Sequence, residues 1–141
     1  MAESTFTLKL VTPQRKLLES EAVALQVPGS EGYLGILAHH APLITTLQPG
    51  RLDVRVPGGT SRSFAVSGGF LEVSGNRATV LADSAERIEE IDRARAESSL
   101  KRAEQRLEAA GSGDSSVDRA RALRSLARAK NRLAWVSAAR T

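Results

Sequence analysis

The sequence contains no cysteine, few aromatic residues and no long hydrophobic run. Because no thiol is present, disulfide frameworks and thiolate metal sites are excluded. Aromatic residues make up only 4% of the chain, so the core has to be built mainly from Val, Leu, Ile and Ala. No stretch approaches the roughly 18 apolar residues of a membrane-spanning helix, and the N-terminal residues lack the apolar segment of a secretion signal. We therefore expect a soluble protein of a reducing compartment that can still dock on a membrane complex.

Proline and glycine are scarce in the second half of the chain. All five prolines lie before residue 58, and only Gly111 and Gly113 fall after Asp83. The charge is divided similarly. Up to Asp83 seven basic residues balance seven acidic ones, whereas the remainder carries thirteen basic and nine acidic residues, the whole excess of +4. This division predicts two domains, residues 1–84 and 85–141.

The first domain alternates apolar and polar residues with a period of two, which is typical of strands with one buried face. In residues 5–12, for example, Phe6, Leu8 and Leu10 share one side. Turn-forming residues, including the stretches 48–50 and 66–70, separate the segments and predict an antiparallel β-sandwich or barrel. The expected strands are 5–12, 21–27, 50–56, 61–66, 70–73 and 77–82.

From about Asp83 the apolar period becomes helical, and two helices are expected with a glycine-containing hinge at 111–116. The alanine-rich stripes would bury little area, so we expect a hairpin that is marginally stable alone and able to open. The expected apolar edges are Ala96, Leu100, Ala103, Leu107 and Ala110 in the first helix and Leu123, Leu126, Leu133 and Val136 in the second.

Acidic and hydroxyl residues mark the expected helix starts. Asp83 with Glu86, and Ser115 with Asp118, have the spacing of capping boxes, and Asp92 can cap or lead the segment that follows it.

The residues of a catalytic or metal site are largely missing. The only histidines, His39 and His40, are adjacent, so in an extended segment they point to opposite sides. The stretch 66–70 (VSGGF) lacks the spacing and the lysine of a phosphate-binding loop and is better explained as a turn. We expect neither a catalytic residue nor a metal site.

Arginines at helical spacing are the most informative feature. In the second helix Arg121, Arg124, Arg128 and Arg132 share one side with Trp135, and in the first helix Arg95, Arg102 and Arg106 share a face. If the hairpin brings the two sets together, an anion between them would relieve their repulsion, because guanidinium groups bind phosphate and carboxylate groups well. A merely solvated face, nucleic acid and an acidic protein surface remain open alternatives.

Several longer motifs point to one family. The stretches GYLGILAHHAPLIT (32–45), FAVSGGFLEV (64–73) and VLADSAERIEEID (80–92), followed by an arginine-rich hairpin, resemble the epsilon subunit of bacterial F-type ATP synthases. The resemblance implies a β-sandwich of about ten strands followed by an antiparallel two-helix hairpin, in agreement with the periodicity.

The resemblance also implies a role. Members of the family are non-catalytic rotor subunits of the central stalk, at the cytoplasmic face of the bacterial inner membrane. Their sandwich packs on the gamma subunit and touches the loops of the c ring, so that proton-driven rotation is coupled to the catalytic head. The corresponding loop is 31–42, with Tyr33 and His40 as contact positions. Tyr33 departs from the glutamate of many relatives.

The hairpin is the regulatory part in similar proteins. Folded on the sandwich it lets the enzyme run, and extended along gamma it enters the catalytic head, among the alpha and beta subunits, and inhibits ATP hydrolysis. The resemblance implies that its basic face then meets acidic residues of beta through Arg121, Arg124, Arg128 and Arg132.

In some relatives the folded hairpin binds ATP as a regulatory ligand, although no cofactor is required. The matching positions here are Glu86, Ile91, Asp92, Arg95, Ala96, Arg102, Arg128 and Arg132.

Two alternatives come from other classes. One is a free-standing adapter whose basic hairpin binds RNA or an acidic protein, and the other is an ATP-sensing module that acts elsewhere. The second leaves the LGILAHHAPL stretch (34–43) unexplained.

Overall fold

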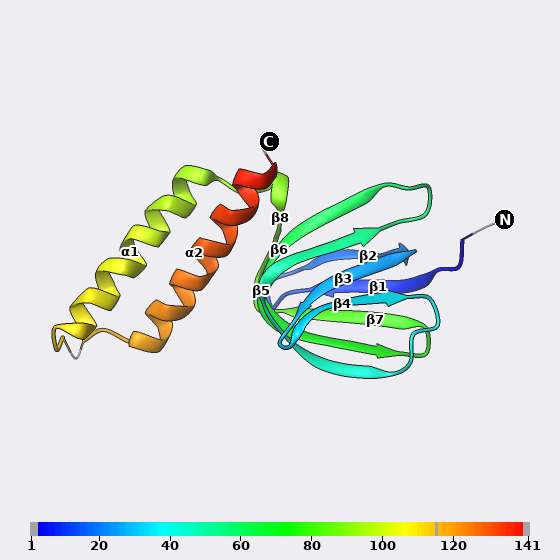
Figure 1. Cartoon of the computed structure of the whole chain (residues 1–141), viewed down its shortest axis with the longest axis horizontal. Coiled ribbons are helices and arrows are strands. Elements are labelled where there is room, and N and C mark those ends of the chain that lie inside the picture. The colour runs from blue at the N-terminus through cyan, green and yellow to red at the C-terminus, as the bar shows by residue number, and fades with distance from the viewer. Residues whose placement is uncertain (1–2, 115, 140–141) are drawn as a thin grey trace. The chain divides into compact units, whose positions relative to one another are not determined.

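A computed structural model of the chain describes residues 3–114 and 116–139, with side chains to Val136. The chain divides into two compact units, Met1–Arg87 and Ile88–Thr141. The first is a folded sheet and the second a helical hairpin (Figure 1). The predicted order, a mainly antiparallel β-sandwich followed by two helices, is confirmed.

One continuous sheet forms the first unit and folds over into two layers (Figure 1). Its strand order is β2-β1-β7-β6-β5-β3-β4, with β8 paired to β6. All pairs are antiparallel except β1 with β7, a parallel pair that the sequence pattern did not indicate. The eight strands of the described residues are β1 (Phe6–Val11), β2 (Lys16–Ala22), β3 (Ala24–Gly29), β4 (Gly32–Leu37), β5 (Leu43–Arg55), β6 (Ser61–Ser74), β7 (Arg77–Ala82) and β8 (Ala85–Arg87).

Strands β5 and β6 are 13 and 14 residues long and pair along their whole length. The predictions of turns at 48–50 and 66–70 are therefore wrong, because both stretches lie inside these strands. Gly68 and Gly69 have positive φ angles of 113° and 135°, and a Cβ on Gly69 would lie 2.1 Å from the Leu81 carbonyl oxygen. These glycines let β6 change neighbours without breaking: it pairs with β8 before them and with β7 from Gly69 onward.

The apolar positions of the predicted strands do form the core. Phe6, Leu8 and Leu10 are buried, as the period of two indicated. The predicted strand 21–27 is interrupted, however, since Val23 separates β2 from β3. Strands β2, β4 and β8 were not resolved by the pattern as separate elements. Other core residues include Leu25, Val27, Ile36, Leu52, Val54, Phe64, Val66, Leu71 and Val80.

The helical unit begins with η1 (Ile88–Glu90), followed by α1 (Arg93–Gly111). Asp92 is the N-cap of α1, as predicted, because its carboxylate accepts a hydrogen bond from the Arg95 backbone N–H at 3.1 Å. The proposed capping box of Asp83 and Glu86 is wrong. Asp83 lies in the bend after β7, where its N–H donates to the Gly68 carbonyl oxygen, and Glu86 belongs to β8.

Helix α2 (Arg119–Ala139) follows the turn after α1. Asp118 caps it, accepting a hydrogen bond from the Arg121 backbone N–H at 3.0 Å. In the expected capping box Ser115 was the cap and Asp118 its partner. Ser115 lies outside the described residues, and the cap observed is Asp118 itself. In the connection Gly113 has a φ of 91°, which suits the sharp reversal.

Alanines form the seam between the helices. Ala96 and Ala103 of α1 and Ala122, Ala129 and Val136 of α2 are buried, at intervals of seven along each helix. The predicted edge of α2 is thus partly wrong: Leu123 is 46% exposed, and Leu126 and Leu133 are only half-buried. Since a methyl group is all that each alanine contributes, the helices can approach closely but bury little apolar area.

Candidate functional site

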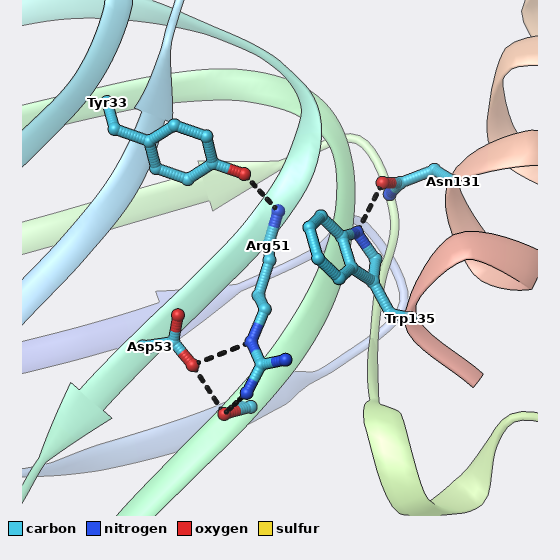
Figure 2. Close-up of polar contacts among 6 residues, drawn as sticks. Tyr33, Arg51, Asp53, Asn131 and Trp135 are labelled. Carbon is cyan, nitrogen blue, oxygen red and sulfur yellow. Dashed lines mark hydrogen bonds and ion pairs between the residues drawn. The ribbon is translucent and has the colours of Figure 1, made fainter. Parts of the chain in front are cut away.

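The arginine stripe of α2 stands on the surface of the helical unit. Arg121, Arg124 and Arg128 are exposed and Arg132 is half-buried. At about 100° per residue these side chains lie along one side of the helix, roughly a quarter-turn from the alanine seam. Trp135 ends the stripe, and its indole N–H donates to the Asn131 side-chain oxygen at 2.6 Å (Figure 2).

The arginines of α1 emerge on the same face of the hairpin. Arg95, Arg102 and Arg106 are exposed and also lie about a quarter-turn from the buried alanines. A groove of about 220 Å³ near the turn is lined by Arg106 of α1 and Arg121 of α2, so at this end of the hairpin one arginine of each set lines the same groove. Sequence reasoning missed this groove because it depends on the path of the turn. Its other lining residues are Ser116, Val117, Asp118 and Ala122. We call the seven arginines (95, 102, 106, 121, 124, 128 and 132) the arginine face.

Most of the arginine face has no carboxylate partner. Among the described residues, no Asp or Glu lies within ion-pair distance of Arg95, Arg102, Arg106, Arg121, Arg124 or Arg128. Two of these guanidinium groups instead bond to serine hydroxyls of their own helix. Arg102 donates to Ser99, and Arg128 donates to Ser125, each at 3.2 Å. These six guanidinium groups therefore form a positive surface that is not neutralised by ion pairs with described carboxylates.

The IDRARA motif has mainly structural contacts. Ile91 is buried, Asp92 caps α1, and Ala96 belongs to the seam. Asp92 and Arg95 are both exposed, but the Asp92 carboxylate is engaged by the cap, so Arg95 is the charged side chain of this group that could hold an anion. Among the other predicted nucleotide-binding positions, Arg102, Arg128 and Arg132 lie on the arginine face, and Glu86 lies on β8 of the sandwich unit with a half-buried side chain.

Tyr33 is tied to its own sheet. Its hydroxyl oxygen accepts a hydrogen bond from the Arg51 backbone N–H at 3.1 Å (Figure 2). The Arg51 side chain in turn donates to Asp53 at 2.9 Å and to Ser63 at 3.1 Å. The tyrosine therefore reaches from β4 to β5, with its ring 47% exposed beside this polar network.

His40 lies in the loop between β4 and β5. Its ring Nδ1 is 2.7 Å from the Ala41 carbonyl oxygen, and its backbone N–H donates to the Leu37 carbonyl oxygen. The neighbouring residue, His39, has a left-handed φ of 64° rather than the extended conformation assumed from sequence.

An exposed apolar row crosses the outer face of β6, β7 and β1. Phe70 pairs with Leu81, and Leu81 pairs with Val11. Phe70 is 53% exposed, Leu81 is 50% exposed, and Ile44 of β5, diagonal to Phe70 and two residues from its partner Thr46, is 75% exposed. We call Val11, Ile44, Phe70 and Leu81 the apolar patch. Sequence reasoning missed it because alternation shows which residues share a face and not which strands adjoin. Contiguous patches of this kind mark contact surfaces.

In the described part of the chain no cluster of three His, Asp or Glu side chains could hold a metal ion. Within that part, too, no helix combines the length and apolar character needed to cross a membrane.

Family models match nearly the whole chain. The delta/epsilon-chain β-sandwich domain of ATP synthase matches residues 5–88, and the long α-helix domain of the same chain matches residues 89–136. The chain belongs to the ATP synthase delta/epsilon family. Membership makes it a non-catalytic subunit and disfavours the free-standing adapter.

Similar proteins agree with this assignment. An ATP synthase epsilon chain of Pelotomaculum thermopropionicum is 50% identical over 107 residues, which are 76% of this chain and 79% of the relative. An epsilon chain of Koribacter versatilis is 48% identical over 107 residues, 76% of this chain and 75% of the relative. A chain in the OSCP/F1/c-ring structure of the Euglena gracilis mitochondrial ATP synthase is 25% identical and superposes with a TM-score of 0.77, covering 100% of this chain and 84% of that one.

Proposed function

We propose that this chain is a rotor and regulatory subunit of the central stalk of a bacterial proton-translocating F-type ATP synthase. The sandwich docks on the gamma subunit and on the loops of the c ring, which couples rotation to the catalytic head. The hairpin restrains ATP hydrolysis. The subunit associates with the cytoplasmic face of the inner membrane only through the complex. The observation that carries the regulatory part is the arginine face, with six guanidinium groups that have no carboxylate partner among the described residues.

The apolar patch supports docking by the sandwich. It spans β1, β7, β6 and β5, and three of its side chains, Ile44, Phe70 and Leu81, are half or more exposed and would lose their contact with water in a complex. A gamma subunit that covers it would bury several hundred Å², a useful fraction of the roughly 800 Å² per partner of a stable interface.

The hairpin has the energetics of a switch. Its seam contributes little apolar burial, and the like charges of the arginine face oppose each other when the helices are closed. Two anionic partners would relieve that repulsion in different states. The triphosphate of ATP would stabilise the folded hairpin, and acidic residues of the beta subunit would stabilise the extended one within the catalytic head formed by alpha and beta.

ATP therefore acts as a regulatory ligand in this proposal. Arg95, Arg102, Arg128 and Arg132 would hold the phosphates, with Glu86, Ile91, Asp92 and Ala96 completing the family's site. A fivefold preference of ATP for the folded state would correspond to about 1 kcal/mol of coupling free energy.

Titration of the isolated subunit with ATP, followed by amide chemical shifts, tests the nucleotide site. We expect shifts centred on residues 91–102 and 128–132, together with weaker binding in R102Q and R128Q. K101Q removes one positive charge from the exposed surface of α1 and serves as the matched control. Unchanged spectra at millimolar ATP would contradict nucleotide binding and leave the stalk role intact.

Truncation tests inhibition. The chain should end after Arg87, because β8 pairs with β6 and belongs to the sandwich unit. We expect the truncated subunit to assemble and ATP hydrolysis by the complex to rise. If the truncated complex hydrolyses ATP no faster than the intact one, the hairpin is not an inhibitor in this enzyme.

A further inference from the structure

Asn76, in the turn between β6 and β7, connects three segments at one end of the sandwich. Its side-chain oxygen accepts a hydrogen bond from the His39 backbone N–H at 2.7 Å, and its side-chain NH₂ donates to the Thr5 carbonyl oxygen at 2.9 Å. Its carbonyl oxygen accepts from the Thr7 N–H at 3.2 Å. Asn76 and His39 both have left-handed φ angles, 59° and 64°. The loop 38–42 is thus fastened to the sheet through a conformation that few side chains adopt readily.

The next residue of this loop, His40, makes a side-chain contact within the loop itself. The ring Nδ1 lies 2.7 Å from the Ala41 carbonyl oxygen. A carbonyl oxygen can only accept, so the neutral ring must carry its proton on Nδ1. The opposite nitrogen, Nε2, then carries a lone pair. No described residue donates a hydrogen bond to it.

The surrounding loop offers no stronger acceptor. Residues 38–42 contain no acidic side chain. Tyr33 is the other residue expected to contact the c ring. Its hydroxyl oxygen already accepts a hydrogen bond from the Arg51 backbone N–H (Figure 2). His40 is only partly exposed, so its ring is held at the surface and does not extend freely into solvent.

We propose that Nε2 of His40 is a preset hydrogen-bond acceptor for an N–H donor on the partner of this loop. The donor would be an arginine, lysine or amide side chain. Asn76 acts as a positioning residue, since it holds the loop in which the tautomer of His40 is selected. The segment 31–42, expected from sequence to be a loop, contains strand β4, and only 38–42 is loop. The inference rests on the proposed docking of this segment on the c ring and specifies the chemistry of that contact.

The tautomer can be measured directly on the isolated subunit. Long-range ¹H–¹⁵N correlation spectra at pH 8 distinguish a protonated Nδ1 from a protonated Nε2. We expect His40 to carry the proton on Nδ1 and His39 to show no such restriction. In N76G, which keeps the left-handed backbone but loses both side-chain bonds, the His40 tautomers should become mixed. A proton on Nε2 of His40 in the unaltered subunit would overturn the proposal.

Rebinding of the catalytic head, carrying variant subunits, to stripped membranes tests the contact. H40N can still donate to Ala41 but places nothing at the position of Nε2, whereas H40Q can place an amide oxygen there. We expect H40N to weaken rebinding about 2- to 10-fold, the usual effect of one hydrogen bond, and H40Q to restore part of it. H39N keeps a residue that tolerates left-handed φ and should rebind normally.

The outcomes distinguish failure of the His40 acceptor proposal from failure of the proposed docking role. If H40N and H40Q both rebind like the unaltered subunit while removal of the subunit abolishes coupling, the acceptor proposal fails and the stalk role stands. If the subunit makes no difference to rebinding at all, the docking role fails, whichever tautomer the spectra show.

Discussion

Phe70 of β6 and Leu81 of β7 lie directly opposite each other, and each leaves half of its side chain on the outer surface of the sheet. Cross-strand pairs of large side chains stabilise a sheet, but here both also remain in contact with water. With Val11 and Ile44 they form the apolar patch, which extends over four neighbouring strands of the domain.

Replacing this pair should weaken docking without unfolding the sandwich. We expect F70T/L81T to bind the proposed gamma subunit at least tenfold more weakly, since central apolar contacts dominate most interfaces. The free energy of unfolding should change by less than about 1 kcal/mol, because threonine keeps a high strand propensity. Titration calorimetry and urea unfolding measure the two effects. L37T, an exposed leucine on β4 at the end of the strand order, is the control. Equal affinities of the two variants would remove the patch from the interface.

Gly69 should tolerate no side chain. Its φ is 135°, and the Leu81 carbonyl oxygen lies 2.1 Å from the position that a Cβ would occupy. We therefore expect G69A to lower the free energy of unfolding by more than about 2 kcal/mol. G35A has open space around the new methyl group and should stay within about 1 kcal/mol of the unaltered chain. Urea denaturation of both variants makes the comparison, and a mild G69A would mean that β6 can bend in another way.

A larger side chain in the alanine seam should loosen the hairpin alone. A103L places a leucine where Ala103 is 1% exposed, and overpacking of this kind costs about 1–3 kcal/mol. We expect faster amide hydrogen exchange in residues 93–136, with unchanged exchange in the strands. S98L adds the same side chain at an exposed position of α1 and should leave exchange unaltered. Loss of protection in both units would instead indicate that they unfold together.

The turn of the hairpin contains one carboxylate with a shifted pKa. The Ser116 hydroxyl donates to Asp114 at 2.6 Å and the Ser116 backbone N–H donates at 2.9 Å, and these bonds lower the pKa of Asp114 below its ordinary value. A lowered pKa in the folded state stabilises the fold above the unfolded-state value and loses that effect as the pH falls through the folded-state value.

In S116A the pKa of Asp114 should therefore rise, although the remaining backbone bond keeps it from returning fully. The unfolding stabilities of S116A and the unaltered chain should differ above about pH 4 and converge at lower pH. A carboxyl ¹³C titration measures the pKa. S112A, whose hydroxyl donates to the Glu108 carbonyl oxygen, should leave it in place.

Periodicity predicted the two-part architecture because each half obeys a single rule. Alternation identified Phe6, Leu8 and Leu10 as core residues, and the cap residue Asp92 located the start of α1. The turn predicted at Gly68 and Gly69 was wrong. A pair of glycines favours a turn locally, and only the pairing with the neighbouring strands shows that β6 continues through them.

Some of the candidate sites could be predicted from the sequence and others could not. The arginine face could be read from the sequence because helical spacing fixes which side chains share a side. The apolar patch, the groove at Arg106 and Arg121, and the bond from His39 to Asn76 join residues far apart in the chain. Each depends on strand order or on the path of a turn, neither of which local patterns specify.

The continuity of β6 through its glycine bend has a mechanical consequence. In a sandwich made of two separate sheets, a shearing load on one layer reaches the other only through side chains that can slip past each other. Here one continuous strand, β6, runs through both layers. It pairs with β8 before the glycine bend and with β7 after it. A torque applied to either layer would pass through peptide bonds, so the domain would turn as a stiff body instead of deforming.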